Sequence, residues 1–327
     1  MTGVTVPRIT RRQLLRWATA AGVATFGGCA SPSPLRVAIQ PWGGYQFMGL
    51  AAKEGWLPPD VEIVFTPTGV DSVRRVVEGS VHGAALTLDQ ALVLVDQGLM
   101  LDIVLITNVS AGADVLLVRP AIKTLADLRG KRIGAEATSL GEVMVTKVLE
   151  AAGLERADVQ VVEMTEDHVA SWHAHEMDAL VTYEPAIGQL LQLGLAPLFD
   201  TRSLPQTILD VLAIRHDALE MHEEQVRALV AGHFRALHAW RTNPIDTAYR
   251  LAPLMQMPVE RVGPAFHGLD LPDEDYNRHY LEGPSEELLR VTADISAILL
   301  QAGIIKSHVE ARQLFTADFV PAPFRQP

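Results

Sequence analysis

The chain has 327 residues, of which 48% are hydrophobic, and its 27 basic residues stand against 39 acidic ones, a net charge of −12. This acidic balance argues against a nucleic-acid-binding protein, because a phosphate backbone requires a basic surface. With a single cysteine the chain forms no internal disulfide, so its stability has to come from the packing of a large core.

The N-terminal segment has the pattern of an export signal. Arg11 and Arg12 precede an apolar run over 17–26, which is half of the roughly 20 residues that span a bilayer as a helix. Paired arginines at this place are typical of a twin-arginine signal. Cys29 follows two glycines at the expected cleavage point, as in a bacterial lipobox, where the thiol receives a lipid; the alternative is a buried cysteine near a chain end. We therefore expect residues 1–28 to be a twin-arginine lipoprotein signal peptide and Cys29 to be lipidated.

Removal of this segment would leave a strongly acidic body. Residues 1–28 hold four arginines and no acidic residue, so 23 basic residues would remain against 39 acidic ones, a net charge of −16. Serine and proline alternate over 31–34, and we expect residues 29–34 to be the lipidated cysteine and a short linker. The pattern predicts a periplasmic location, or one at the outer face of the cell membrane, with a lipid anchor as the contact to the membrane.

Short apolar runs alternate with helix-like segments up to residue 214. The predicted strands are 35–39, 61–65, 83–86, 102–107, 115–118, 132–135, 159–164, 179–182 and 211–214. Helical spacing is found at 73–77, 91–95, 143–152 and 186–193, and later at 222–243, 247–255 and 286–302, where no strand is expected. The alternation predicts an α/β fold with mainly parallel sheets covered by helices, followed by a helical C-terminal part.

Two α/β units follow each other along the chain. The first covers 35–118, and the second begins at 124–134 and ends near Asp210. We expect lobe I to contain residues 35–118 and 212–327, and lobe II residues 119–211. Because ligands of open α/β sheets bind beyond the carboxyl ends of the strands, a ligand cleft is expected between these lobes.

Several motifs that follow predicted strands resemble a known family. They are RVAIQPWGGY at 36–45, AALTLD at 84–89, NVSAGAD at 108–114, LADLRGKRIG at 125–134, EATSLG at 136–141, MDALVTYEP at 177–185 and DVL at 210–212. In order and spacing they resemble the solute-binding lipoproteins of ABC importers, in the branch of the alkanesulfonate-, taurine-, nitrate- and thiamine-pyrimidine-precursor-binding proteins. The resemblance implies a two-lobed periplasmic-binding-protein type II fold, a solute in the interlobe cleft and ABC permease subunits as partners. Members of this branch often have proline where this chain has Gly43.

Thirteen residues of these motifs are candidate ligand-binding residues. They are Trp42, Tyr45, Thr87, Asp89, Asn108, Ser110, Asp114, Glu136, Thr138, Ser139, Tyr183, Glu184 and Asp210. The aromatic rings offer flat faces to an aromatic or cationic ligand. For Asp89, Thr138, Ser139 and Glu184 the alternative is a role as a helix cap, and for Trp42 it is packing in the core.

The charges of these candidates bear on the class of ligand. Five of them are acidic and none is arginine or lysine. Asp114 and Asp210 each precede an apolar strand, where an unpaired carboxylate is costly, so we expect a ligand or a hinge hydrogen bond to be their partner. Carboxylates repel anions, which favours an amine-bearing or heteroaromatic solute such as a pyrimidine. A sulfonate or nitrate held by backbone N–H groups at helix starts is the alternative.

Motifs for catalysis are missing from the sequence. It contains no Gly-x-Ser-x-Gly elbow and no phosphate-binding loop, and His168, His173 and His175 do not form a His-Glu-x-x-His pattern. We therefore expect a binding protein without enzymatic activity, metal or cofactor. One alternative is an enzyme that resembles the yeast-type pyrimidine synthase, whose cysteine-rich iron motif this chain lacks. The other is a lipid-anchored ligand sensor.

Overall fold

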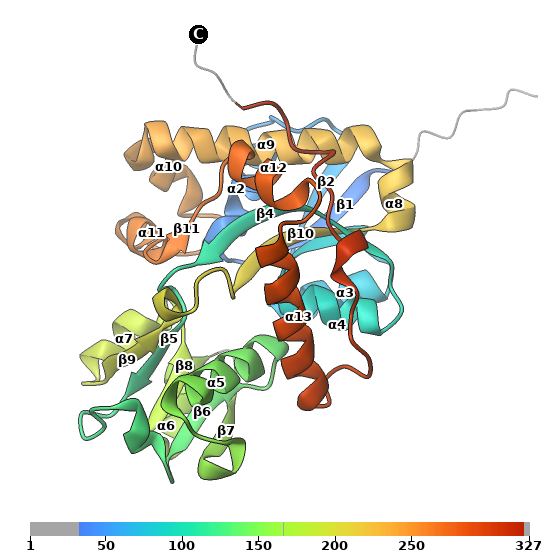
Figure 1. Cartoon of the computed structure of the whole chain (residues 1–327). Coiled ribbons are helices and arrows are strands. Elements are labelled where there is room, and N and C mark those ends of the chain that lie inside the picture. The colour runs from blue at the N-terminus through green and yellow to red at the C-terminus, as the bar shows by residue number, and fades with distance from the viewer. Residues whose placement is uncertain (1–32, 166, 324–327) are drawn as a thin grey trace, which may run out of the picture. The chain divides into compact units, whose positions relative to one another are not determined.

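The computed structural model describes residues 33–165 and 167–323 (Figure 1). The described residues from Pro34 onward form one compact unit. The expected signal peptide and the expected lipidation site at Cys29 lie outside the described residues.

The first sheet has six strands in the order β11-β4-β10-β3-β1-β2. Its strands are β1 (Leu35–Ile39), β2 (Val61–Phe65), β3 (Gly83–Thr87), β4 (Leu101–Ser110), β10 (Leu209–Arg215) and β11 (Leu269–Asp270). β1 pairs in parallel with β2 and β3, whereas β10 is antiparallel to both β3 and β4, and β11 is antiparallel to β4.

The second sheet has five strands in the order β7-β6-β8-β5-β9. Its strands are β5 (Val115–Val118), β6 (Arg132–Glu136), β7 (Gln160–Met164), β8 (Ala179–Thr182) and β9 (Ala196–Asp200). β6 is parallel to β7 and β8, and β5 is antiparallel to β8 and β9.

Both sheets are thus mixed, and the expectation of mainly parallel sheets is wrong. Apart from the short β11–β4 pair, the antiparallel pairs involve β5 and β10, the strands by which the chain enters the second sheet and returns to the first. β10 is buried along almost its whole length, and after Asp210 its residues 211–214 are a continuous apolar run. An apolar run has the same sequence pattern in a parallel and in an antiparallel strand. The sequence therefore does not determine whether this strand pairs in parallel or antiparallel.

Sheet membership also shifts the expected lobe limits. Residues 115–118, which were expected in lobe I, form β5 of the second sheet, and residues 209–211, expected in lobe II, begin β10 of the first sheet. The chain therefore crosses between the sheets at 111–114 and again at 201–208.

Helices cover the sheets and make up most of the chain after β10 (Figure 1). They are α2 (Gln46–Lys53), α3 (Gly69–Val77), α4 (Leu88–Asp96), α5 (Ser139–Ala152), α6 (His168–Ala174), α7 (Ala186–Gln192), α8 (His216–Met221), α9 (Glu223–Thr242), α10 (Pro244–Leu251), α11 (Val259–Ala265), α12 (Glu274–Leu281) and α13 (Glu286–Gln301). Short 3₁₀ turns include η1 (Gly43–Tyr45) and η4 (Thr201–Ser203). In the described part of the chain, none of the helices has the length and hydropathy needed to cross a bilayer.

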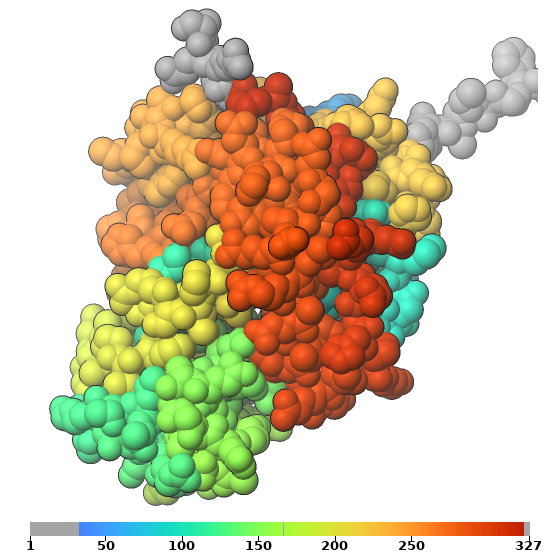
Figure 2. All heavy atoms as spheres, in the orientation of Figure 1, coloured from blue at the N-terminus to red at the C-terminus, as the bar shows by residue number. Residues whose placement is uncertain are grey.

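The C-terminal helices connect the two halves of the body. The main hydrophobic core runs from Leu35 on β1 through Val143 on α5 to Leu299 on α13, so it contains residues of both sheets. A second, smaller core around Trp172 and Leu180 belongs to the second sheet alone. Figure 2 shows the residues of the C-terminal helices, in orange and red, covering much of one face of the molecule, beside the green residues of the second sheet.

Candidate functional site

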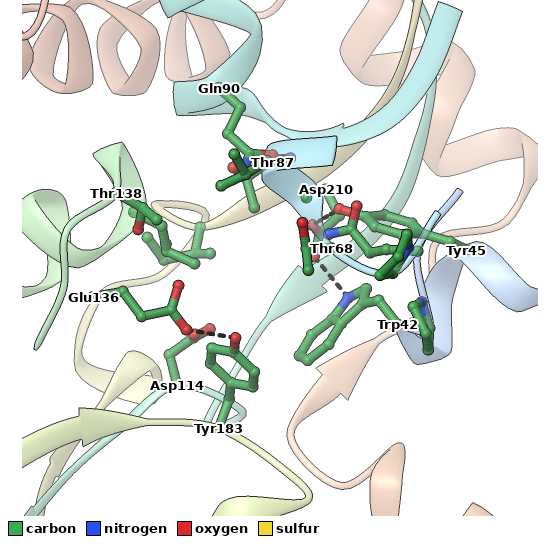
Figure 3. A pocket seen from close by; sticks show the side chains of 17 residues that line it. Trp42, Tyr45, Thr68, Thr87, Gln90, Asp114, Glu136, Thr138, Tyr183 and Asp210 are labelled. Carbon is green, nitrogen blue, oxygen red and sulfur yellow. Dashed lines mark hydrogen bonds between the residues drawn. The ribbon is translucent and has the colours of Figure 1, made fainter. Parts of the chain in front are cut away.

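A cavity of about 180 Å³ lies where the ends of strands from both sheets meet (Figure 3). It is lined by Gln40, Pro41, Trp42, Tyr45, Pro67, Thr68, Gly69, Val70, Thr87, Gln90, Asp114, Glu136, Thr138, Leu140, Tyr183, Ile208 and Asp210. The first sheet contributes the segments that follow β1, β2 and β3, and the second sheet contributes the ends of β6 and β8. This position, beyond the carboxyl ends of parallel strands, is the usual ligand site of open α/β sheets.

Asp210 is the centre of a buried hydrogen-bond cluster on the side of the first sheet. Its Oδ1 accepts the hydroxyl of Tyr45, and its Oδ2 accepts the indole Nε1–H of Trp42 at 3.1 Å and the side-chain amide of Asn108. Burial raises the pKa of Asp210 to about 7, although the bonds from Tyr45 and Asn108 oppose this rise. Burial and the Asp210 carboxyl raise the pKa of Tyr45 as well.

Gly44 allows this cluster to form. A Cβ atom at position 44 would lie 1.8 Å from Oδ1 of Asn108. Any residue with a side chain at this position would therefore displace the side-chain amide of Asn108. Gly44 thus lets a side chain of β4 approach the turn.

Glu136 forms the corresponding cluster on the side of the second sheet. Its Oε1 accepts the hydroxyl of Tyr183 at 2.6 Å and lies 2.7 Å from Nε2 of His168. The other ring nitrogen of His168 lies 2.9 Å from the hydroxyl of Thr182. Burial on its own would raise the pKa of Glu136, but the hydrogen bonds from His168 and Tyr183 outweigh it and lower that pKa.

The rings of Trp42 and Tyr183 join the two clusters. Their centroids are 5.6 Å apart and their planes are nearly perpendicular, an edge-to-face contact between residues that follow strands of different sheets. The cavity is thus bounded by aromatic rings from both sides (Figure 3).

Asp114 lies in the first crossing segment and is only 3% exposed. Its backbone N–H donates to Oγ of Ser110, and that hydroxyl is in turn 2.7 Å from the hydroxyl of Thr201. Burial raises the pKa of Asp114 to about 6, the Ser110 hydroxyl opposes the rise, and the charges of Asp89 and Glu136 add to it.

Eight of the thirteen candidate residues line the cavity: Trp42, Tyr45, Thr87, Asp114, Glu136, Thr138, Tyr183 and Asp210. Thr138 is also the N-cap of α5, since its hydroxyl accepts the N–H of Gly141. The capping alternative is therefore correct for Thr138.

The other five candidates do not line the cavity. Asn108 and Ser110 are buried behind Asp210 and Asp114, to which they are bonded. Asp89 and Ser139 are bonded to each other, with 2.5 Å between Oδ2 and Oγ, and join α4 to α5. Glu184 accepts the N–H of Gly188 near the start of α7, as a capping residue does.

Nine lining residues are not among the candidates predicted from the sequence. They are Gln40, Pro41, Pro67, Thr68, Gly69, Val70, Gln90, Leu140 and Ile208. The segment 67–70 comes directly after β2, so the rule that selected the loops after the other strands would have found it. Its Pro-Thr-Gly sequence gave no chemical signal of its own.

None of the lining residues is arginine or lysine, whereas three are acidic. Across 33–165 and 167–323, no three histidine, cysteine or acidic side chains come together in a way that could hold a metal ion. The arrangement is suited to enclosing a small organic molecule between aromatic faces and carboxylates.

Comparisons with known proteins agree with this architecture. The fold is that of the periplasmic binding proteins: the aliphatic sulphonate binding protein SsuA of Escherichia coli superposes with a TM-score of 0.73 at 21% identity, over 91% of this chain and 97% of that one. A model of the NMT1/THI5-like family matches residues 49–247, and the chain belongs to this family. The two-lobed fold and the resemblance to a solute-binding family are thereby confirmed.

Of two further similar proteins, one is named as a binding protein and the other as an enzyme. The taurine-binding periplasmic protein of Escherichia coli (strain K12) is 25% identical over 181 residues, which are 54% of this chain and 56% of that protein. The match thus spans little more than half the length of this relative. The desulfurization enzyme DSZB shares the fold with a TM-score of 0.60 at 16% identity, over 87% of this chain and 97% of that one.

Proposed function

We propose that the protein is the extracytoplasmic solute-binding component of an ABC importer. In this role it captures a small organic solute in the cavity between the two sheets and delivers it, chemically unchanged, to the permease subunits. The observation that carries the proposal is the cavity itself, which is bounded by residues of both sheets and therefore closes or opens as the sheets move.

The relatives support this role. The taurine-binding and sulphonate-binding proteins are periplasmic by name, and both are similar to this chain over long segments. Export by the twin-arginine signal and a lipid on Cys29 agree with such a location, at the outer face of a membrane or in the periplasm.

The lining residues favour an amine-bearing or heteroaromatic solute over a sulfonate. Asp114, Glu136 and Asp210 face the cavity without a lysine or arginine among its lining residues. Carboxylates in a partly desolvated site repel an anion and attract hydrogen-bond donors or positive charge. Trp42 and Tyr183 offer ring faces and edges to an aromatic ligand.

Binding without turnover is the test of this function. A panel of amines, pyrimidines, sulfonates and nitrate is added to the purified protein, and the shift in melting temperature identifies ligands by mass action. Each ligand is then recovered after long incubation and identified by mass spectrometry. Recovery of unchanged ligand with reversible binding is expected. Product formation would instead favour an enzyme, the alternative that the likeness to DSZB makes worth testing.

A further inference from the structure

The three carboxyl groups that line the cavity differ in how well the protein itself satisfies them. Asp210 receives three hydrogen bonds, from Trp42, Tyr45 and Asn108, and these occupy both of its oxygens. Its acceptor capacity is thus largely used, and its role is to hold the indole and phenol rings in place. Asp210 is a positioning residue.

Glu136 and Asp114 retain free acceptor capacity. Both donors to Glu136, Tyr183 and His168, act on Oε1, and no described residue donates to its Oε2. Figure 3 shows one carboxyl oxygen of Glu136 bonded to Tyr183 and the other turned away from that bond toward the cavity. Among the described residues, the donor found near the carboxyl group of Asp114, which is 3% exposed, is the hydroxyl of Ser110. That hydroxyl also accepts the backbone N–H of Asp114 and lies 2.7 Å from the hydroxyl of Thr201.

None of the residues that line the cavity is lysine or arginine. The basic side chain that the structure places against these groups is His168, which lies 2.7 Å from Glu136 and whose other ring nitrogen contacts Thr182. A buried carboxylate with an open acceptor costs free energy unless a donor or a positive charge reaches it. Asp114 and Glu136 also repel each other, which raises this cost.

The rest of the cavity is suited to an apolar body. Trp42, Tyr183 and Leu140 are among its walls, with Val70 and Ile208. Its volume of about 180 Å³ is close to the roughly 150 Å³ of an apolar cavity that accepts benzene. The space therefore accommodates about one ring, or a short aliphatic chain, together with a small polar group.

We infer that the solute is an organic cation, whose protonated amine lies between Asp114 and Glu136 and whose apolar body contacts Trp42 and Tyr183. The inference rests on the proposed function and narrows its ligand class from amine-bearing or heteroaromatic molecules to positively charged amines. The same two carboxylates exclude sulfonates, which the name of SsuA mentions, as ligands of this cavity.

The test compares ligands of the same body and different charge. Benzylamine, benzyl alcohol and phenylmethanesulfonate form one set, and butylamine, butanol and butanesulfonate form a second. Each is titrated near pH 8 by calorimetry, where the amines are protonated and Asp114 is ionised. We expect the amine of a set to bind at least about tenfold more tightly than its alcohol, and the sulfonate not to bind.

Variants separate charge recognition from positioning. Asp114→Asn and Glu136→Gln are each expected to lower amine affinity about tenfold or more, and the double variant should lose the preference for amine over alcohol. Asp210→Asn should lower the affinity for amine and alcohol by similar factors, because it acts through the placement of Trp42. Asp275→Asn, an exposed position in the first turn of α12, is the matched control and should leave affinity unchanged.

The outcomes distinguish the two claims. Tighter binding of an alcohol or a sulfonate than of the amine overturns the cationic ligand and leaves the solute-binding role in place. Conversion of a bound amine overturns the solute-binding role and retains the charge preference. If no member of either set binds, both claims fall.

Discussion

The fold buries the carboxyl groups of Asp210 and Asp114, so their ionisation costs free energy. Each is buried, and the donors around Asp210 are neutral, so hydrogen bonding only partly replaces the lost hydration. A binding protein benefits from such groups because a charged ligand then recovers energy that the empty site lacks. Burial of these two carboxyl groups therefore lowers the stability of the ligand-free protein and is linked to ligand binding.

These two groups make the stability of the ligand-free protein depend on pH. Their pKa values rise from 3.8 in the unfolded chain to about 7 for Asp210 and about 6 for Asp114, so the folded state holds protons more tightly. Their contribution to stability is fully present below pH 3.8 and is lost as the pH rises through these folded values. Each unit of pKa difference corresponds to about 1.4 kcal/mol. Urea denaturation should show these two carboxyl groups lowering the unfolding free energy by a few kcal/mol between pH 5 and pH 8. Up to about pH 6.5 this fall is partly offset by His233, because burial lowers the pKa of its imidazole to about 3.

The same experiment on variants assigns the effect. Asp210→Asn cannot ionise, so its unfolding free energy should change less over this pH range. Asp275→Asn should keep the full wild-type slope. Glu136, whose folded pKa is lowered, contributes in the opposite sense and at more acidic pH, so it does not mask the effect. Equal slopes in wild type and Asp210→Asn would contradict the assignment.

Residues of the site were predictable where they have a chemical signature and follow a strand. Trp42, Asp114 and Tyr183 satisfy both conditions and line the cavity. Asn108 and Ser110 follow the predicted strand 102–107, yet β4 extends to Ser110, so both lie within the strand. Their side chains are buried behind Asp210 and Asp114 and do not line the cavity. Which side faces the ligand depends on the sheet, and the sequence alone does not give it.

At the scale of elements, the turn η1 depends on Gly44. An alanine there would place its Cβ 1.8 Å from Asn108 and push the amide away from Asp210. Gly44→Ala is therefore expected to destabilise the protein by about 1–3 kcal/mol, as a buried polar group loses its partner, and to weaken ligand binding about tenfold. Chemical denaturation and titration with the tightest-binding amine measure the two effects.

Gly263 provides the matched control for this substitution. It lies within α11, and a Cβ there meets nothing within 4 Å. Gly263→Ala should leave binding unchanged. Because Gly263 precedes Pro264, which disfavours a helical backbone at a residue with a Cβ, no gain in stability from helix propensity is expected. Equal losses of affinity in both variants would show that Gly44 has no special role.

Elements were predictable where their apolar pattern is strong. β1, β2, β5 and β8 were predicted with their observed limits. β9 was missed because it contains Pro197 and is largely exposed at the edge of its sheet. The helix α2 was missed because six consecutive residues, Gln46 to Ala51, are buried, which removes the amphipathic period that identifies a helix. The two-residue strand β11 contradicts the expectation that no strand follows β10, and its length gives no pattern to detect.

For the whole molecule, the contacts between the two halves decide how readily the cavity opens. Ser139 on α5 donates to Asp89 on α4, and Lys147 on α5 pairs with Asp294 on α13 at 2.5 Å. Both contacts join a helix that follows the second sheet to helices packed on the first. None of these four residues lines the cavity, so the two contacts hold the halves together in this structure without touching a ligand in the cavity.

Loss of the Ser139 hydroxyl should therefore weaken ligand binding from a distance. In Ser139→Ala the closed state loses one hydrogen bond and leaves the buried Asp89 with fewer donors, at a cost of about 1–3 kcal/mol. The apparent affinity falls with the population of the closed state, so we expect a loss of about tenfold for the tightest-binding amine. Ser139→Thr keeps the hydroxyl and should retain most of the affinity.

Small-angle scattering gives an independent measurement. The ligand-free Ser139→Ala variant should have a larger radius of gyration than wild type, and saturating ligand should reduce the difference. Identical scattering of the two proteins, with unchanged affinity, would mean that this bond does not contribute to closure.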